Sequence, residues 1–314
     1  MTLGQTSASG GGCTTAYPYT QIQLQVATGS SYVVPGSGVI TSWSHAAGPS
    51  GKGQMQLKVY RPTPTPNGYQ VVRESPMQKL APNVLNTFPI SLGVQAGDLI
   101  GYSRPANSTV NCTLVTGLAG DVGADAPQAD DPMGTTTIFN APAKGGRINV
   151  SAVFYAYPAV EAVIPPTASV LGGETITLAG HDFTDASAVD FAGLPAAGFT
   201  VVSDTRIDVV VPKRNARDTV DVFVTGPAGR SFASTIDRFT FVGCRVPTLK
   251  KRTLKKAKER IRAEGCAVGN VRRAKGVTAK AGRVVKQSPQ PTGAGDFLAP
   301  GTKVSVRLGL PPRR

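Results

Sequence analysis

Several protein classes are excluded by what this 314-residue sequence lacks. No stretch reaches 18 consecutive apolar residues, so no segment can cross a bilayer as a helix. Only two histidines occur, which leaves little room for histidine-based catalysis or a zinc site. No nucleophile-elbow, zincin, P-loop or dinucleotide-binding motif is present. We therefore predict that the protein is not an enzyme and holds no cofactor.

Cysteine is also scarce, with one residue each at positions 13, 112, 244 and 266. None forms a CxxC pair, which argues against a zinc ribbon or a thioredoxin-type motif. Of the three possible connectivities, the simplest pairs Cys13 with Cys112 and Cys244 with Cys266. The second bridge would close a loop of about 22 residues and contribute about 3 kcal/mol. Four free thiols are the alternative.

Disulfides persist in oxidising compartments, so the cysteine pattern predicts an extracellular or cell-wall-associated protein. The first 20 residues are uncharged and rich in Gly, Ser and Thr, without the basic and apolar regions of a signal peptide. We expect the sequence to be a mature form.

Charge is distributed very unevenly along the chain. Residues 244–314 hold 19 of the 33 Lys and Arg but 3 of the 19 Asp and Glu, a net charge of +16. The rest of the chain has a net charge of −2. This asymmetry predicts a polyanionic partner for the C-terminal segment: a cell-wall polymer, a nucleic acid or an anionic membrane.

Glycine and proline are abundant, at 36 and 25 residues, and they separate short β-type runs. Residues 21–26 alternate polar and apolar side chains, as a half-buried strand does. Eight or nine such runs and no convincing helix occur before residue 159. Residues 1–159 are therefore predicted to form an antiparallel β-sandwich of jelly-roll type. Residues 119–133 are predicted to form an exposed loop.

The second segment, residues 160–242, has a recognisable set of motifs. They are Gly-Gly-Glu-Thr-Ile-Thr-Leu-Ala-Gly-His-Asp-Phe at 172–183, Val-Asp-Phe at 189–191 and Val-Asp-Val-Phe-Val-Thr-Gly-Pro-Ala-Gly at 220–229. The segment resembles an IPT/TIG domain across its whole length. That resemblance implies an immunoglobulin-like β-sandwich, which in extracellular proteins commonly acts as a spacer or an association module.

The third segment, residues 243–314, begins with Val246-Pro247 and Leu249 before an amphipathic run. Gln-Ser-Pro-Gln-Pro follows at 287–291, and Pro-Gly-Thr-Lys-Val-Ser-Val at 300–306. The segment resembles a single PASTA domain, a small α+β fold with one helix. Leu254, Ala257 and Ile261 form one apolar stripe, so we expect a helix over 253–264 that is capped by Thr253 and ends at Gly265.

The apolar stripe of this helix must face a sheet, so most of the nearby cations must face outward. They are the candidate binding residues for an anionic wall polymer. The candidates are Lys250, Lys251, Arg252, Lys255, Lys256, Lys258, Arg260, Arg262, Arg272 and Arg273. A solvated helix face without a ligand is the alternative.

Other candidate sites are weaker. Asp121, Asp125, Asp130 and Asp131 supply oxygen ligands that suit calcium, but they lack EF-hand spacing and its bidentate Glu. We therefore expect an ordinary loop there and no metal. The remaining candidates are aromatic residues for a sugar-binding platform in the first domain: Tyr17, Tyr19, Tyr32 and Trp43. His45 and His181 are expected to be structural.

Together these features predict an extracellular, non-enzymatic bacterial protein of three domains, mainly β. The PASTA resemblance implies binding to peptidoglycan or an anionic cell-wall polymer, with the IPT/TIG domain as spacer. The N-terminal sandwich would be a binding or adhesive module for a glycan or protein. One alternative is a structural or self-associating surface protein without wall affinity. A nucleic-acid-binding protein is a weaker alternative, because the basic helix carries no aromatic residue for base stacking.

Overall fold

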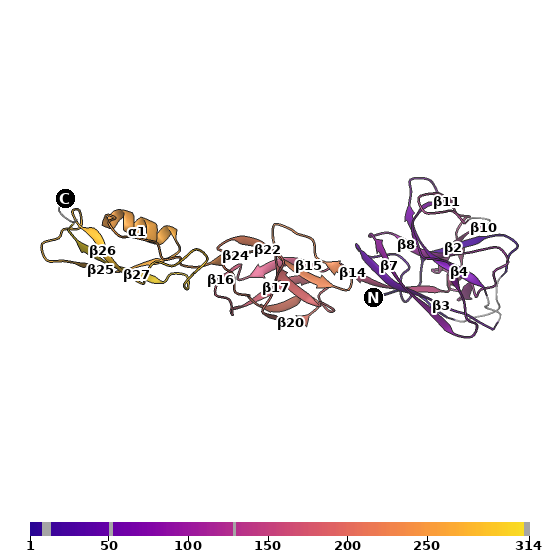
Figure 1. The fold of residues 1–314 in the computed structure, drawn as a ribbon. Coiled ribbons are helices and arrows are strands. Elements are labelled where there is room, and N and C mark those ends of the chain that lie inside the picture. Colours follow the sequence, from indigo (N-terminus) through magenta and orange to yellow (C-terminus); the bar gives the residue numbers. More distant parts are fainter. Residues whose placement is uncertain (8–13, 50–52, 128–129, 311–314) are drawn as a thin grey trace. The chain divides into compact units, whose positions relative to one another are not determined.

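The structure, a computed structural model, describes residues 1–7, 14–49, 53–127 and 130–310 (Figure 1). The chain divides into two compact units, Met1–Tyr157 and Pro158–Arg314. Within the described residues, no helix has the length and apolar character that crossing a membrane requires.

The N-terminal unit is a jelly roll built from eight antiparallel strands. One sheet has the order β1-β14-β3-β7, and the central part of the other has the order β5-β4-β8-β2. The first strand therefore lies beside the last, which is the jelly-roll connection and confirms the predicted β-sandwich. These strands are β1 (Thr2–Gln5), β2 (Tyr19–Gln25), β3 (Gly38–Ala46), β4 (Gln54–Pro62), β5 (Gly68–Glu74), β7 (Leu85–Val94), β8 (Leu99–Arg104) and β14 (Val150–Ala156).

Short strands extend this framework, and one of them corrects the sequence-based expectation. They are β6 (Gln78–Lys79), β9 (Thr113–Val115), β10 (Val122–Pro127), β11 (Thr136–Ile138), β12 (Ala143–Lys144) and β13 (Gly146–Ile148). The prediction of an exposed loop over 119–133 is wrong where β10 pairs with β2. Ala124 and Ala126 alternate into a buried cluster, but alanine has low β propensity and hides this pattern in the sequence.

The two faces of strand β4 contribute side chains to two different apolar clusters of this unit. Met55, Leu57 and Val59 point into the core between the two sheets. Tyr60 points to the opposite face, where Phe139 packs against it at a centroid distance of 5.4 Å. Because side chains alternate along a strand, Lys58 shares the face of Tyr60.

The second unit begins with an immunoglobulin-like sandwich. Its sheets have the orders β15-β17-β21-β20 and β16-β24-β22-β18-β19, with β23 paired to β22. Phe183, Phe191, Phe239 and Phe241 fill the space between them. The strands are β15 (Ala159–Ile164), β16 (Thr167–Ser169), β17 (Thr175–His181), β18 (Ala188–Phe191), β19 (Leu194–Pro195), β20 (Gly198–Ser203), β21 (Arg206–Val210), β22 (Thr219–Gly226), β23 (Gly229–Arg230) and β24 (Arg238–Val242).

The last part of the second unit is a helix packed on one face of a three-stranded sheet. Helix α1 (Leu254–Ala263) covers the sheet β25-β27-β26, formed by β25 (Ala267–Arg273), β27 (Lys303–Gly309) and β26 (Arg283–Ser288). The Thr253 hydroxyl accepts a hydrogen bond from the Lys256 N–H at 3.3 Å, and Gly265 has a φ of +73°. Ala257 and Ile261 are fully buried, so the predicted helix, its caps and its apolar stripe are confirmed.

Candidate functional site

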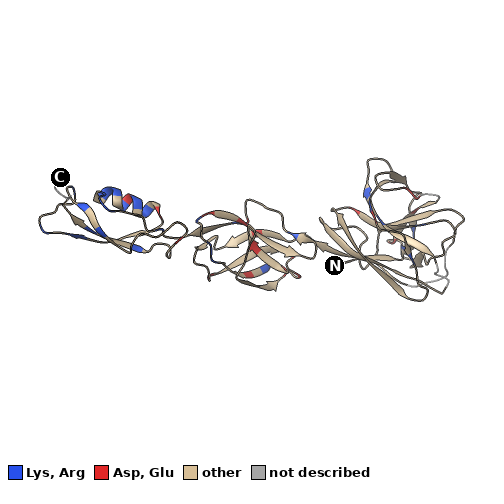
Figure 2. Cartoon of the chain, viewed as in Figure 1, with Lys and Arg blue, Asp and Glu red and all other residues tan. Residues whose placement is uncertain are grey.

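Nine of the ten predicted basic residues are exposed, and Lys258 is half-buried. Figure 2 shows Lys and Arg gathered along α1 and on the strands beside it. Of the ion pairs between described residues, none involves any of these ten cations. Their charges are therefore available to a ligand.

The outward face of α1 carries part of this charge. At 100° per residue, Lys255, Lys256 and Arg262 lie on the side opposite the buried Ala257 and Ile261. Glu259 lies among them and is the one acidic residue of the helix. The helix as a whole carries five cations and this carboxylate, so its exposed face is strongly positive.

A second basic surface lies on the sheet, and the sequence-based candidates captured only part of it. Arg272 of β25 is paired in register with Arg307 of β27, and Arg307 is paired in turn with Lys286 of β26. Register partners on neighbouring strands share a face, so the three side chains form a row across the sheet. All three are exposed, whereas Val304, Val306 and Leu308 of β27 are buried on the helix side. We call Arg272, Arg307 and Lys286 the cation row.

Like charges in register destabilise a sheet, because no opposite charge compensates their repulsion. Nothing among the ion pairs of the described residues neutralises any member of the cation row. An anionic polymer lying across the three strands would remove this repulsion. The row thus combines accessible charge with a physical reason to bind an anion.

A shallow hollow adjoins the row at Lys286. Lys250 and Lys286 supply its charges, and Val285, which is 46% exposed, supplies an apolar wall. The lining residues are Thr248, Lys250, Val284, Val285, Lys286, Gln287, Gln290 and Pro291. The hollow can therefore receive an anionic group attached to a less polar one.

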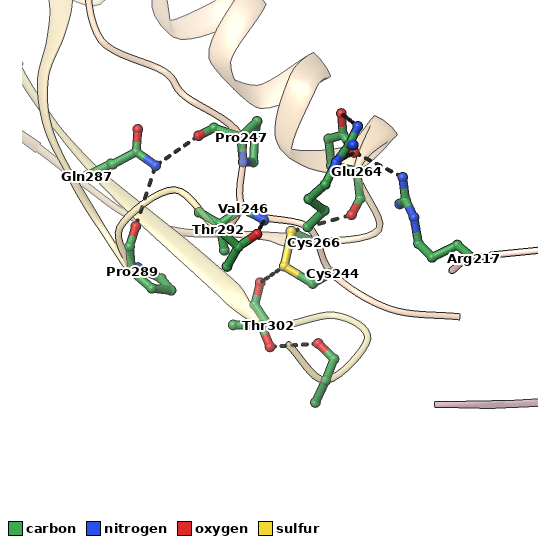
Figure 3. The surroundings of a disulfide bond; sticks show 12 residues. Arg217, Cys244, Val246, Pro247, Glu264, Cys266, Gln287, Pro289, Thr292 and Thr302 are labelled. Carbon is green, nitrogen blue, oxygen red and sulfur yellow. Dashed lines mark hydrogen bonds and ion pairs between the residues drawn. A yellow bond between two sulfur atoms is a disulfide. The ribbon is translucent and has the colours of Figure 1, made fainter. Parts of the chain in front are cut away.

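The segment that carries Lys250 is held to β26 by a buried amide. The Gln287 side chain donates to the Pro247 carbonyl at 2.9 Å (Figure 3). It also accepts from the Leu249 N–H at 2.9 Å. Because Gln287 is 8% exposed, water competes little for these bonds. Lys250 and Lys286 therefore belong to one connected scaffold.

A disulfide closes the same region. Cys244 and Cys266 are bonded, as predicted, and the bridge joins the start of the domain to a residue three positions after the end of α1 (Figure 3). The Thr292 side chain accepts from the Val246 N–H at 3.1 Å beside it. Cys13 lies outside the described residues, so its predicted bridge to Cys112 stays a prediction.

Glu264, the buried acid at the helix end, is fully occupied by protein partners. Two Arg245 nitrogens donate to its oxygens at 3.0 Å, and Arg217 donates at 2.9 Å. The hydrogen bonds from Arg245 are the main cause that lowers the pKa of Glu264 below its ordinary value. This carboxylate therefore compensates two arginines and not the cation row.

The four aspartates considered for calcium lie in three separate settings. Asp121 binds the Ala27 N–H and Arg147, Asp125 accepts from the Tyr19 hydroxyl at 2.8 Å, and Asp130 and Asp131 face Lys58. Burial would raise the pKa of Asp121, but hydrogen bonds from Thr116, Ala27 and Arg147 outweigh it and lower that pKa. Within the described residues, no three potential metal ligands gather at one point.

The aromatic candidates for a sugar platform divide by burial. Trp43 is fully buried and Tyr32 is 2% exposed, so the suggestion of these two as surface residues is wrong. Both fill the jelly-roll core, where large aromatic side chains bury the most apolar area. Tyr19 is half-buried, and Tyr17 is 37% exposed.

The two histidines have no catalytic partners among the described residues. His45 is buried and its Nδ1 contacts the Asn149 carbonyl at 2.7 Å. His181 is exposed and pairs with the adjacent Asp182 at 2.7 Å.

Comparison with known proteins identifies two of the domains. Residues 158–241 match the family model of the IPT/TIG domain, and residues 245–309 match that of the PASTA domain. The chain therefore carries one domain of each family, and both families are non-catalytic. No curated protein matches the chain. Among solved structures, it is similar to the full extracellular region of plexin A4, at 10% identity and a TM-score of 0.26. That match covers 71% of this chain and 18% of the plexin chain.

Proposed function

We propose that the PASTA domain binds an anionic cell-wall polymer, peptidoglycan or an attached polyanion, through the cation row and the hollow beside it. The observation that carries this proposal is the row itself, three exposed cations in register with no described carboxylate partner. PASTA domains as a class bind peptidoglycan or peptides, which supports the same ligand class.

We propose that the protein works outside the cytoplasm. The Cys244–Cys266 bridge is of the kind that persists in oxidising compartments. In this proposal the IPT/TIG domain is a spacer, and the jelly roll is a non-enzymatic module for a glycan or protein ligand.

The test is a sedimentation assay of the full chain with purified bacterial sacculi at low salt. Replacing Arg272, Lys286 and Arg307 together by Gln should weaken binding by about 100-fold, since a cation near a polyanion contributes about 1 kcal/mol. Binding by the unaltered chain should fall steeply as salt rises, because the Debye length shrinks from about 10 Å at 0.1 M to about 3 Å at 1 M.

A matched control removes the same charge from the other unit. Arg73, Lys79 and Lys144 are exposed cations of the jelly roll, and replacing all three by Gln should leave binding unchanged. A third variant, with Lys255, Lys256 and Arg262 replaced by Gln, separates the helix face from the cation row. Sacculi stripped of teichoic acids distinguish peptidoglycan from the attached polyanion.

Failure of the unaltered chain to bind either kind of sacculus would overturn the proposal. Equal losses in the cation-row variant and the jelly-roll control would overturn the assigned surface, because only net charge would then matter. Light scattering of the same samples detects assembly without wall affinity, the outcome expected of a self-associating structural protein.

A further inference from the structure

A lysine is buried among carboxylates in the jelly-roll unit, which does not contain the residues of the proposed wall-binding surface. The Lys58 side chain is 1% exposed, although lysine is almost never fully buried without charged partners. Its Nζ lies 3.0 Å from the Asp130 Oδ1 and 3.7 Å from a Glu74 carboxylate oxygen. It also donates to the Asp131 carbonyl at 2.6 Å.

The strands position each member of this cluster. Lys58 on β4 is paired directly with Glu74 on β5, and its partner on the other side is Gly101 of β8. Glycine has no side chain, so the lysine meets no opposing group from that strand. Asp130 approaches from the segment that follows β10, and Thr137 anchors the neighbouring Asp131 carboxylate at 2.7 Å.

A second hydrogen bond acts on the same carboxylate oxygen. The buried Ser103 hydroxyl donates to the Asp130 Oδ1 at 2.8 Å. Oδ1 therefore accepts from both Lys58 and Ser103, which draws electron density from the carboxyl carbon. Asp130 is 37% exposed, so a small product formed at this oxygen has a path to solvent.

We propose that Lys58 and Asp130 condense into an intramolecular amide, with Glu74 as the proton relay. Glu74 takes a proton from the ammonium and the freed Nζ attacks the Asp130 Cγ. The Nζ–Cγ bond forms and the Cγ–Oδ1 bond breaks. The two protons lost by the ammonium leave with Oδ1 as one water molecule. The reaction changes no oxidation state and needs no other reactant.

Burial favours this product over the ion pair. Keeping the Lys58 ammonium out of water costs free energy that its attraction to the carboxylates only partly returns, and the amide carries no charge. The low water content around Lys58 also disfavours hydrolysis back to the separate side chains. The bond would join the segment after β10 to the centre of the sheet.

The test is the intact mass of the full chain, denatured and reduced so that disulfides do not contribute. We expect the unaltered protein to weigh one water molecule less than its sequence requires. Proteolysis should then release a branched peptide that contains both position 58 and position 130. The mass of the uncondensed chain, persisting after prolonged incubation of the folded protein, would overturn the proposal.

Variants test which residues take part in the condensation and how. Lys58→Arg keeps the positive charge but should not lose water, so its mass should equal the mass that its sequence requires. The same is expected of Asp130→Ala. Glu74→Gln should slow condensation and leave a mixture of the two masses. Asp125→Asn, which alters another carboxylate of the jelly roll that is bonded to Tyr19, is the matched control and should condense fully. Condensation in Asp130→Ala would overturn the assigned partner, and the wild-type result stands even if a variant fails to fold.

Discussion

The imidazole of His45 is a fully buried titratable side chain of the jelly roll. Its Nδ1 faces a backbone carbonyl, which can only accept, so Nδ1 carries the proton of the neutral ring. No described residue forms a hydrogen bond with Nε2. Burial disfavours the charged form and lowers the pKa of His45 from 6.5 to about 4.

The stability of the jelly roll should therefore fall below about pH 6.5. Between about pH 6.5 and pH 4 the imidazole binds a proton in the unfolded chain but not in the folded chain. The contribution of His45 to the free energy of unfolding is therefore fully present above pH 6.5 and is lost as the pH falls toward 4. Between pH 7 and pH 5 the loss should be about 2 kcal/mol. Urea unfolding of the full chain at several pH values measures it. His45→Gln should abolish this slope, whereas His181→Gln should keep it, and an equal slope in both variants would contradict the assignment.

Individual residues also mark the limits of sequence-based prediction here. Lys58 lies in Gln-Met-Gln-Leu-Lys-Val-Tyr, an alternation in which the polar positions are expected to face solvent. The segment that contains Asp130 and Asp131 covers that face, and the sequence does not show this contact. The sequence-based candidates include Arg272 of the cation row but not Lys286 or Arg307, because the three residues meet only through strand register.

At the scale of elements, the sequence predicted the features that depend on residues close together in the chain. The apolar spacing, Thr253 and Gly265 defined helix α1, and its observed bounds differ from the prediction by one residue at each end. Strand β10 escaped prediction because its buried positions are alanines. Motif order identified two whole domains, since turns and strand ends in these families carry characteristic residues.

The Cys244–Cys266 bridge should stabilise the PASTA domain by about 3 kcal/mol, because it closes a loop of 22 residues in the unfolded chain. Replacing both cysteines by Ser should lower the unfolding temperature of the unit that contains this domain and leave that of the jelly roll unchanged. Calorimetry of the full chain measures both transitions. An unchanged transition of that unit would show that the bridge does not restrict the unfolded state.

At the scale of the whole molecule, the IPT/TIG and PASTA domains share contacts within one compact unit. Arg217 precedes β22 of the IPT/TIG domain, and it binds Glu264 at the end of the PASTA helix. Its guanidinium also lies 5.7 Å from the ring of Phe297, which packs against the IPT/TIG core. These contacts should make the two domains unfold together.

Glu264→Ala should uncouple them. The change leaves Arg217 and Arg245 without the carboxylate that both of them bind, and so removes the ion pair that joins the two domains. Calorimetry should then show separate IPT/TIG and PASTA transitions where the unaltered chain shows one. Glu259→Ala, on the exposed face of the same helix, is the matched control and should keep the single transition. A single transition in both variants would contradict coupling through Glu264.

The placement of β1 beside β14 has a consequence for how the jelly roll forms. Thr2 is paired with Val153, so the first strand of the domain cannot pair until the last strand has been synthesised. Pairings between residues so distant in sequence give a high contact order and slow folding. The α1 helix and the strands after it, in contrast, join residues within about 60 positions. During synthesis the jelly roll should therefore be the slow step, with β1 exposed until its partner emerges from the ribosome.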